Sequence, residues 1–214
     1  MFLSELIKII DVNEIIKKNK NKYFNKITSF SKEVDEKTIF FIDSKKKIKT
    51  EYLKEAIEKN TPGIITEKVY KNISKVQFVV KDINKEIKKL LNKLKPHKPI
   101  KSIAITGTNG KTSVAWYVSE ICKLNKIKIK MQGTLGYYIN GKKYNNGILT
   151  TPSYDTLHQN SYSRKKNIFN FIFEFSSHAL QQNRIKSYPL DIGAITNITH
   201  DHLDYHKSLS NYKK

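Results

Sequence analysis

The sequence predicts two consecutive α/β domains, the second of which has a mostly parallel sheet and a phosphate-binding loop. Short apolar runs alternate with segments of helical periodicity, and a glycine-rich turn at 107–110 stands between one such run and a helix. A charged segment with two prolines, 95–99, interrupts this alternation. We therefore expect a small amino-terminal domain over 1–95, a linker over 96–99 and a central domain over 100–214.

The amino-terminal domain is predicted from the spacing of its apolar residues. We expect helices where these residues recur every three or four positions, and strands where short apolar runs are bounded by turn residues. The predicted helices cover 2–10, 52–57 and 83–94, and the predicted strands cover 38–42, 63–65 and 76–80.

The central domain opens with the stretch that says most about function. The run Ile103–Ile105 has strand character, and Lys111 is expected to begin a helix, because apolar residues follow at helical spacing: Val114, Ala115, Tyr117, Val118, Ile121 and Leu124. Gly107 and Gly110 let the backbone wrap around a polyphosphate, at which the helix N-terminus directs its free N–H groups. Lys111 can reach terminal phosphates, and the Thr112 hydroxyl is placed to ligate Mg²⁺.

Further elements are expected along the rest of this domain. The pair Asn140-Gly141 predicts a tight hairpin, and Leu157 belongs to a predicted helix. The almost wholly apolar segment 169–175 predicts a strand covered on both faces. Residues 191–197 predict another inner strand.

Two polar clusters follow the loop, and in open α/β sheets ligands gather beyond the carboxyl ends of strands. Thr150-Thr151-Pro152 is by itself only a turn. Glu174 ends a buried strand, where a carboxylate is costly unless it is paired or ligates a metal, so it is a candidate Mg²⁺ ligand. Arg184 suits a bidentate contact with an anionic substrate. Beside it, the cleft would be lined by Ser176, His178 and Gln182.

A third polar cluster lies at 197–206. It holds three histidines and two aspartates within seven residues, 200–206. A zinc site is one interpretation, since histidines two and four residues apart can both ligate. A Mg²⁺-bound nucleotide explains more of the chain, and His202 would then be a second metal ligand.

Four strings, taken in order, resemble those of the Mur ligases. They are Ile-Thr-Gly-Thr-Asn-Gly-Lys-Thr (105–112), Thr-Thr-Pro (150–152), Glu-x-Ser-Ser-His-Ala-Leu (174–180) and Asn-Ile-Thr-x-Asp-His-Leu-Asp-Tyr-His (197–206). The last two are the more specific, and they are most similar to the members that add the third amino acid to the peptidoglycan peptide. The resemblance is strong over 103–212 and weak over 1–95.

The resemblance implies an enzyme that uses ATP and Mg²⁺ to join an amino acid to UDP-N-acetylmuramoyl-L-alanyl-D-glutamate through an acyl phosphate. It implies catalytic roles for Lys111, Glu174 and His202, with Thr112, Glu174 and His202 as metal ligands. The ATP-binding residues would be Gly107, Thr108, Asn109, Gly110, Lys111, Thr112 and Ser113. The UDP-substrate would be bound by Ser29, Ser31, Thr150, Thr151, Ser176, Gln182 and Arg184.

The chain departs from the family's pattern at two places in its amino-terminal domain and at its carboxyl-terminal end. Thr28-Ser29-Phe30-Ser31-Lys32 stands where the family shows Thr-x-Asp-Ser-Arg, and Ser44-Lys45-Lys46-Lys47 replaces a glycine-rich segment. The family's third domain, which binds the incoming amino acid, has no counterpart before Lys214. We therefore expect a truncated ligase that does not complete the reaction alone, with the choice between diaminopimelate and lysine and the oligomeric state left open.

Three alternatives remain. The chain could be a folylpolyglutamate synthase-like or other Mur ligase, a non-catalytic nucleotide- or UDP-sugar-binding fragment, or a basic nucleic-acid-binding module. The net charge of +21 favours a nucleic-acid-binding module. However, only Arg164 and Arg184 of the 40 basic residues are arginine, and the lysines are spread along the chain, so we expect no nucleic-acid partner. One cysteine, no span-length apolar run and no secretory signal predict a cytoplasmic protein without a membrane partner.

Overall fold

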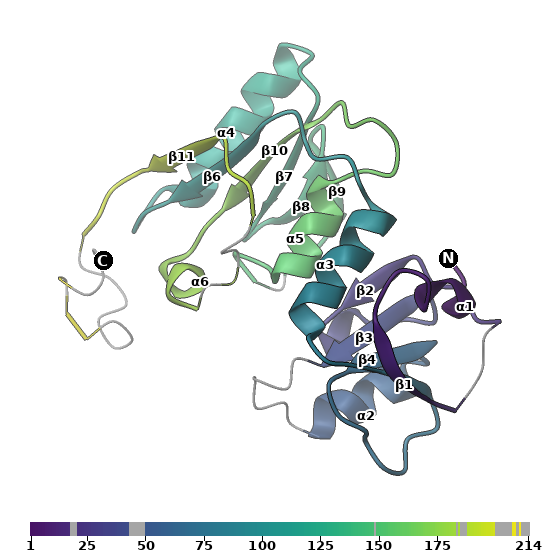
Figure 1. Ribbon diagram of the computed structural model, residues 1–214. Helices are drawn as coiled ribbons and strands as arrows, with labels where there is room; N and C mark the ends of the chain where they lie inside the picture. Colours follow the sequence, from purple (N-terminus) through teal and green to yellow (C-terminus); the bar gives the residue numbers. More distant parts are fainter. Residues whose placement is uncertain are drawn as a thin grey trace. The chain divides into compact units, whose positions relative to one another are not determined.

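The computed structural model describes residues 1–17, 21–42, 50–147, 149–182, 184, 188–199, 207–208 and 210. The chain divides into two compact units, Met1–Pro96 and His97–Lys214. Each unit contains one mostly parallel β-sheet with helices packed against it (Figure 1). The predicted α/β class is therefore confirmed.

The sheet of the first unit has the strand order β1-β5-β4-β3-β2. Strands β2 to β5 run parallel, and β1 runs antiparallel to β5. The strands are Val12–Ile16 (β1), Lys26–Thr28 (β2), Thr38–Ile42 (β3), Gly63–Thr66 (β4) and Val76–Val80 (β5). The helices are Leu3–Leu6 (α1), Thr50–Glu58 (α2) and Ile83–Leu94 (α3), with a 3₁₀ turn at Ser31–Glu33.

The apolar run 39–42 of β3 is explained by cover on both faces. Phe40 packs with Leu53 of α2 on one face, and its neighbour Ile39, which points the other way, is equally buried. Helix α3 begins where the Asp82 side chain accepts a hydrogen bond from the backbone N–H of Lys85. The strands predicted over 38–42, 63–65 and 76–80 and the helices over 52–57 and 83–94 are confirmed. The helix predicted over 2–10 ends at Leu6, because the chain turns there toward β1.

The sheet of the second unit has the order β11-β6-β10-β7-β8-β9, in which β11, β6, β10 and β7 are parallel and the other pairs antiparallel. Its strands are Ser102–Thr106 (β6), Ile129–Gly133 (β7), Gly136–Ile139 (β8), Lys142–Asn145 (β9), Asn170–Glu174 (β10) and Ile192–Ile195 (β11). Its helices are Lys111–Leu124 (α4), Tyr154–Ser161 (α5) and Ser177–Gln181 (α6).

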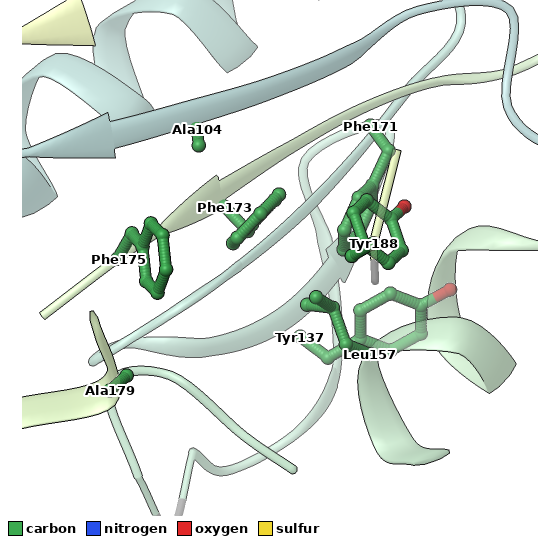
Figure 2. Packing of buried hydrophobic residues seen from close by; sticks show 8 residues of the cluster. All are labelled: Ala104, Tyr137, Leu157, Phe171, Phe173, Phe175, Ala179 and Tyr188. Atoms are coloured by element: carbon green, nitrogen blue, oxygen red, sulfur yellow. The ribbon is translucent and has the colours of Figure 1, made fainter. Parts of the chain in front are cut away.

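Alternating residues of β10 belong to two separate cores, one on each face of this sheet. Ile172 packs with Ala115 of α4, whereas Phe171 and Phe173 pack with Leu157 of α5 on the other face. Figure 2 shows this second cluster, in which Tyr188 lies edge-on to Phe173 with ring centroids 5.5 Å apart. Burial of β10 on both faces confirms the prediction for 169–175 and fixes the position of Glu174 at the strand's end.

The strand order places a topological switch point between β6 and β10. From β6 the chain passes through α4 to β7, beyond β10, whereas from β10 it passes through α6 to β11, on the far side of β6. The two helices lie on opposite faces, since α4 and α6 contribute to different cores. The loops after two neighbouring strands therefore diverge and leave a crevice at their carboxyl ends, where open α/β sheets bind ligands.

Three features of this unit differ from or refine the predictions. The hairpin at Asn140-Gly141 is confirmed, with φ of 49° and 77° at the two residues. The segment 191–197 is not an inner strand: within the described residues β11 is at the sheet's edge, and Ile195 is 64% exposed. In α4, Tyr117, Ile121 and Leu124 are exposed, because the residues that contact the sheet lie on the opposite side of the helix. None of the helices in the described ranges is long and apolar enough to cross a membrane.

Candidate nucleotide-binding site

The loop between β6 and α4 has the backbone that its glycines allow. Gly107 has φ of +131° and Gly110, the residue before α4, has φ of +83°, both in a region that disfavours residues with a Cβ. Helix α4 begins at Lys111 and runs for 14 residues, so its free N–H groups and positive dipole end face the loop. The geometry is that of an anion-binding helix N-terminus.

This loop is held from behind by the segment that follows β11. The Thr196 hydroxyl donates to the carbonyl oxygen of Asn109 at 2.6 Å, and the Asn197 side chain bonds both backbone groups of the same residue. The backbone N–H of Thr108 donates to the carbonyl of Asn197 at 2.9 Å. A Cβ on Gly107 would lie 2.2 Å from the Thr196 oxygen, so this close approach requires glycine.

Lys111 folds back across the loop. Its Nζ donates to the carbonyl oxygens of Gly107 and Thr108 at 2.7 and 2.8 Å. The ammonium group thus lies against the loop, and Lys111 lines the same pocket as the loop residues, so a phosphate bound to the loop would lie close to this charge. Half-buried at this position, Lys111 supplies a positive charge beside the loop.

Glu174 is the carboxylate of the site, and it is 1% exposed. It accepts three hydrogen bonds: from the Thr112 hydroxyl at 2.8 Å, and from the backbone N–H and hydroxyl of Thr134 at 2.9 and 3.0 Å. Gly133 lets the carboxylate approach, because a Cβ there would lie 2.0 Å from Oε1. These bonds offset the cost of burying the charge.

The Thr150-Thr151 turn is joined to the end of β10 by a second set of bonds. The Thr151 hydroxyl donates to the carbonyl oxygen of Glu174 at 3.0 Å and accepts from the backbone N–H of Ser176 at 2.9 Å. Arg184 donates from Nη1 to the carbonyl oxygen of Thr151 at 3.0 Å. The Thr150-Thr151 turn therefore lies against the end of β10, the strand that carries Glu174.

These elements surround one pocket of about 280 Å³. It is lined by the loop and first turn of α4, by Glu174 and by neighbouring hydroxyl residues: Gly107, Thr108, Asn109, Gly110, Lys111, Thr112, Ser113, Thr134, Thr150, Glu174, Ser176 and Ser177. All seven residues predicted for ATP binding are in this set, as are Glu174, Thr150 and Ser176.

The donor set of the pocket fits a magnesium nucleotide. Mg²⁺ takes oxygen ligands, and the pocket offers the Glu174 carboxylate beside the Thr112 hydroxyl. The Thr112 hydroxyl donates its proton to Glu174, and the lone pairs of the Thr112 oxygen are then available to a cation. In the part of the chain that the structure describes, no three His, Cys, Asp or Glu side chains gather as a metal site, and His202, with the zinc interpretation, lies outside that part.

The remaining predicted residues lie away from the pocket lining. Thr151, Gln182 and Arg184 form the structure behind it, where Arg184 Nε donates to Gln182 Oε1 at 2.8 Å. Ser29 and Ser31 belong to the first unit, directly after β2.

Ser31 has a partner within its own unit. It is 3% exposed, and its hydroxyl donates to Glu55 at 2.6 Å. This bond, with the nearby Lys59 ammonium, holds the pKa of the Glu55 carboxyl below its usual value.

Gly133-Thr134 and the roles of Thr196 and Asn197 were not predicted from the sequence. Strand β7, which ends at Gly133, alternates Ile129 and Met131 with lysine and glutamine, and this alternation is the signal that would have predicted it. Polar residues at the end of such a strand are then candidates for the same sheet edge as Glu174.

The fold and the pocket together define an α/β protein with a phosphate-loop motif at the switch point of a parallel sheet. The model of the Mur ligase middle domain matches residues 105–214. The chain belongs to the Mur ligase family, and the resemblance inferred from its motifs is confirmed.

Relatives within the family are similar over most of this chain. They are named as UDP-N-acetylmuramoyl-L-alanyl-D-glutamate–2,6-diaminopimelate ligases. That of Clostridioides difficile (strain 630) is 31% identical, with 100% of this chain and 45% of the relative covered. That of Buchnera aphidicola subsp. Schizaphis graminum (strain Sg) is 32% identical, with 92% and 42% covered. The chain thus spans less than half the length of these relatives.

Solved structures of the family share the fold. A structure of a UDP-N-acetylmuramoyl-L-alanyl-D-glutamate–2,6-diaminopimelate ligase superposes with a TM-score of 0.60 at 24% identity, covering 99% of this chain and 43% of that one. A MurF ligase from Thermotoga maritima, in complex with ADP, gives 0.56 at 19% identity, covering 88% and 41%. At these identities the likeness concerns the fold.

Proposed function

We propose that this chain carries the nucleotide site and part of the UDP-substrate site of an ATP-dependent ligase. The ligase would join an amino acid to UDP-N-acetylmuramoyl-L-alanyl-D-glutamate in the cytoplasm. Residues 100–214 would bind ATP and residues 1–95 the uridine end of the substrate. The observation that carries the proposal is the buried Glu174, hydrogen-bonded to Thr112 in a pocket formed by the phosphate loop.

The chemistry of amide formation accounts for the parts of the pocket. A carboxylate becomes reactive toward an amine when its oxygen is phosphorylated, and transfer of the phosphoryl group requires neutralisation of its charge. Lys111 and the N-terminus of α4 supply positive charge from this chain. Thr112 and Glu174 would hold Mg²⁺, which when bound adds charge neutralisation at the phosphates.

The substrate carboxylate would approach from the side of the Thr150-Thr151 turn. Thr150 and Ser176 line the pocket, and both present hydroxyl groups. Arg184 would act through this turn, because it donates to the carbonyl oxygen of Thr151. A lysine could not reproduce the two divergent contacts that Arg184 makes with Thr151 and Gln182.

We propose diaminopimelate rather than lysine as the amino acid added. The support is the name of the relatives, which are 2,6-diaminopimelate ligases. The same names favour this reaction over a folylpolyglutamate synthase.

Isothermal titration of the 214-residue chain tests the nucleotide part of the proposal. A non-hydrolysable ATP analogue with Mg²⁺ should bind saturably, and Lys111→Ala should weaken binding at least about tenfold, because a charge-assisted contact to a phosphate is worth roughly 1.5–3 kcal/mol. Lys142→Ala, at an exposed position of β9, is the matched control and should bind as the wild type does. Equal binding by Lys111→Ala would overturn the nucleotide site.

A second titration tests the substrate part. UDP-N-acetylmuramoyl-L-alanyl-D-glutamate should bind to the wild-type chain in the presence of the analogue, and Arg184→Lys should weaken it while leaving analogue binding intact. If the chain bound the analogue but showed no affinity for the muramoyl dipeptide, the proposed substrate would be wrong and another carboxylate substrate would have to be sought.

A further inference from the structure

We infer that Thr134 is a positioning residue for Glu174 that also connects it to the Thr150 side of the pocket. The inference rests on the proposed function, in that Glu174 is taken as a ligand of the Mg²⁺ that accompanies the nucleotide. Thr134 follows β7 and lies outside every motif of the sequence analysis.

The contacts of Thr134 fix both oxygens of the carboxylate. Its backbone N–H donates to Oε1 of Glu174 at 2.9 Å and its hydroxyl donates to Oε2 at 3.0 Å. Two bonds from one residue determine the orientation of the carboxylate plane, which a single bond from Thr112 would leave free to rotate. Gly133, the preceding residue, leaves the room for this approach.

The directions of these bonds follow from the number of protons available. A hydroxyl has one proton, and those of Thr112 and Thr134 are both donated to Glu174. The 3.1 Å contact between Thr134 and Thr150 must then be donated by Thr150. All bonds of the chain Thr150–Thr134–Glu174 therefore point toward the carboxylate.

This arrangement prepares Glu174 for a cation. A carboxylate has about four lone-pair positions, and three are taken by the bonds described. The remaining position lies on Oε1, in a residue that lines the pocket. Partners that orient a metal ligand raise metal affinity, and their loss typically weakens it by about 10- to 100-fold.

Thr134 is exposed and lines the pocket. Its hydroxyl contacts two side chains, the buried Glu174 and the half-buried Thr150. Thr134→Val keeps the shape and the backbone N–H bond and removes only the hydroxyl. Thr134→Ser restores the hydroxyl with one methyl group fewer. This pair separates the hydrogen bond from packing.

The experiment is titration of ADP into the full chain at several Mg²⁺ concentrations and in EDTA. We expect Thr134→Val to raise the Mg²⁺ concentration for half-maximal enhancement of ADP affinity by about tenfold, while ADP affinity in EDTA stays within about twofold. Thr134→Ser should restore the wild-type requirement. Thr50→Val, an exposed threonine of the first unit, is the control for hydroxyl loss.

Three outcomes decide the matter. An unchanged Mg²⁺ requirement in Thr134→Val would overturn the inference. An equal loss of affinity with and without Mg²⁺, not rescued by serine, would also overturn it, since that is the effect of structural damage to the pocket. A wild-type chain that binds ADP without any response to Mg²⁺, or does not bind it, would overturn the proposed function and with it this role.

Discussion

The side chain of Asn197 pairs with the backbone of Asn109 through two hydrogen bonds, in the way that a neighbouring strand would. Its Nδ2 donates to the carbonyl oxygen at 3.0 Å, and its Oδ1 accepts from the N–H at 3.1 Å. Asn109 is exposed at the tip of the phosphate loop. The shape of the loop thus depends on a residue 88 positions away in the chain.

Asn197→Ala should loosen the loop and weaken nucleotide binding. Loss of the two bonds leaves the loop to sample conformations that do not fit a phosphate, and the ordering cost then falls on binding. We expect the dissociation constant of Mg²⁺-ADP to rise roughly tenfold, equivalent to about 1.4 kcal/mol. Fluorescence titration with a labelled nucleotide measures it, with Asn146→Ala as the control at an exposed position. Unchanged affinity would show that the loop holds its shape without Asn197.

Gly133→Ala should displace Glu174 without disturbing the sheet. Gly133 has an ordinary strand conformation, so alanine is allowed by the backbone, but its Cβ would lie 2.0 Å from Glu174 Oε1. We expect Mg²⁺-dependent nucleotide binding to fall at least about tenfold, because a carboxylate that is no longer held in its orientation binds the metal more weakly. Gly193→Ala is the matched control, because this strand glycine of the same sheet has open space where its Cβ would be.

The double variant Gly133→Ala/Glu174→Asp sharpens this prediction. Aspartate is shorter by one methylene group, which removes the contacts of the added Cβ with Cδ and Oε1 and leaves that with the Cγ position at 2.8 Å, so it should recover part of the Mg²⁺ dependence. If Gly133→Ala and Gly193→Ala behaved alike in the titration, contact between Gly133 and Glu174 would not matter for binding.

The two loop glycines should differ sharply in their tolerance of alanine. At Gly110 only the positive φ is unfavourable, since the nearest atoms to an added Cβ are 4.0 Å away, and we expect a cost of about 1–2 kcal/mol in the free energy of unfolding. At Gly107 a Cβ would also meet Thr196 and Asn197 at 2.2 and 2.8 Å, so the cost should be larger by several-fold. Urea denaturation of the two variants measures both, and equal losses would contradict the structure.

The parts of the site that the sequence predicted are those encoded locally. The phosphate loop is one continuous string, and Thr112 and Glu174 were each predicted as metal ligands by a separate rule: where a P-loop threonine points, and why a carboxylate ends a buried strand. The hydrogen bond that joins the two side chains was not predicted. The missed residues depend on strand order. Thr134 and Asn197 reach the site only because β7 and β11 lie on either side of the β10 and β6 pair, and no local pattern encodes that order.

The same reasoning explains the errors in the fold. Periodicity predicted that α4 is a helix, but apolar residues lie on both of its sides. Val114 and Val118 pack against the sheet, whereas Tyr117 and Ile121 are exposed. In β11, apolar composition suggested an inner strand, whereas its position in the order puts it at the edge of the described sheet. Composition indicates that a segment can be buried, and only the topology decides whether it is.

Ser31→Ala tests the electrostatics of the first unit through pH. The pKa of Glu55 is lowered chiefly by the hydrogen bond from Ser31 and next by Lys59. A carboxyl whose pKa is lowered by folding stabilises the protein above its unfolded pKa of about 4.3, and that contribution is lost as the pH falls through the folded pKa. The variant should therefore be less stable than the wild type at pH 7, with a smaller difference at pH 3.

Carbon NMR titration of Glu55 in Ser31→Ala should show its pKa moving up toward the ordinary value. The control is Ser74→Ala, exposed in the same unit, which should leave both the stability and the pKa unchanged. A Glu55 pKa that did not move in Ser31→Ala would mean that the neighbouring lysines, Lys59 and Lys32, set it and that the hydrogen bond from Ser31 does not.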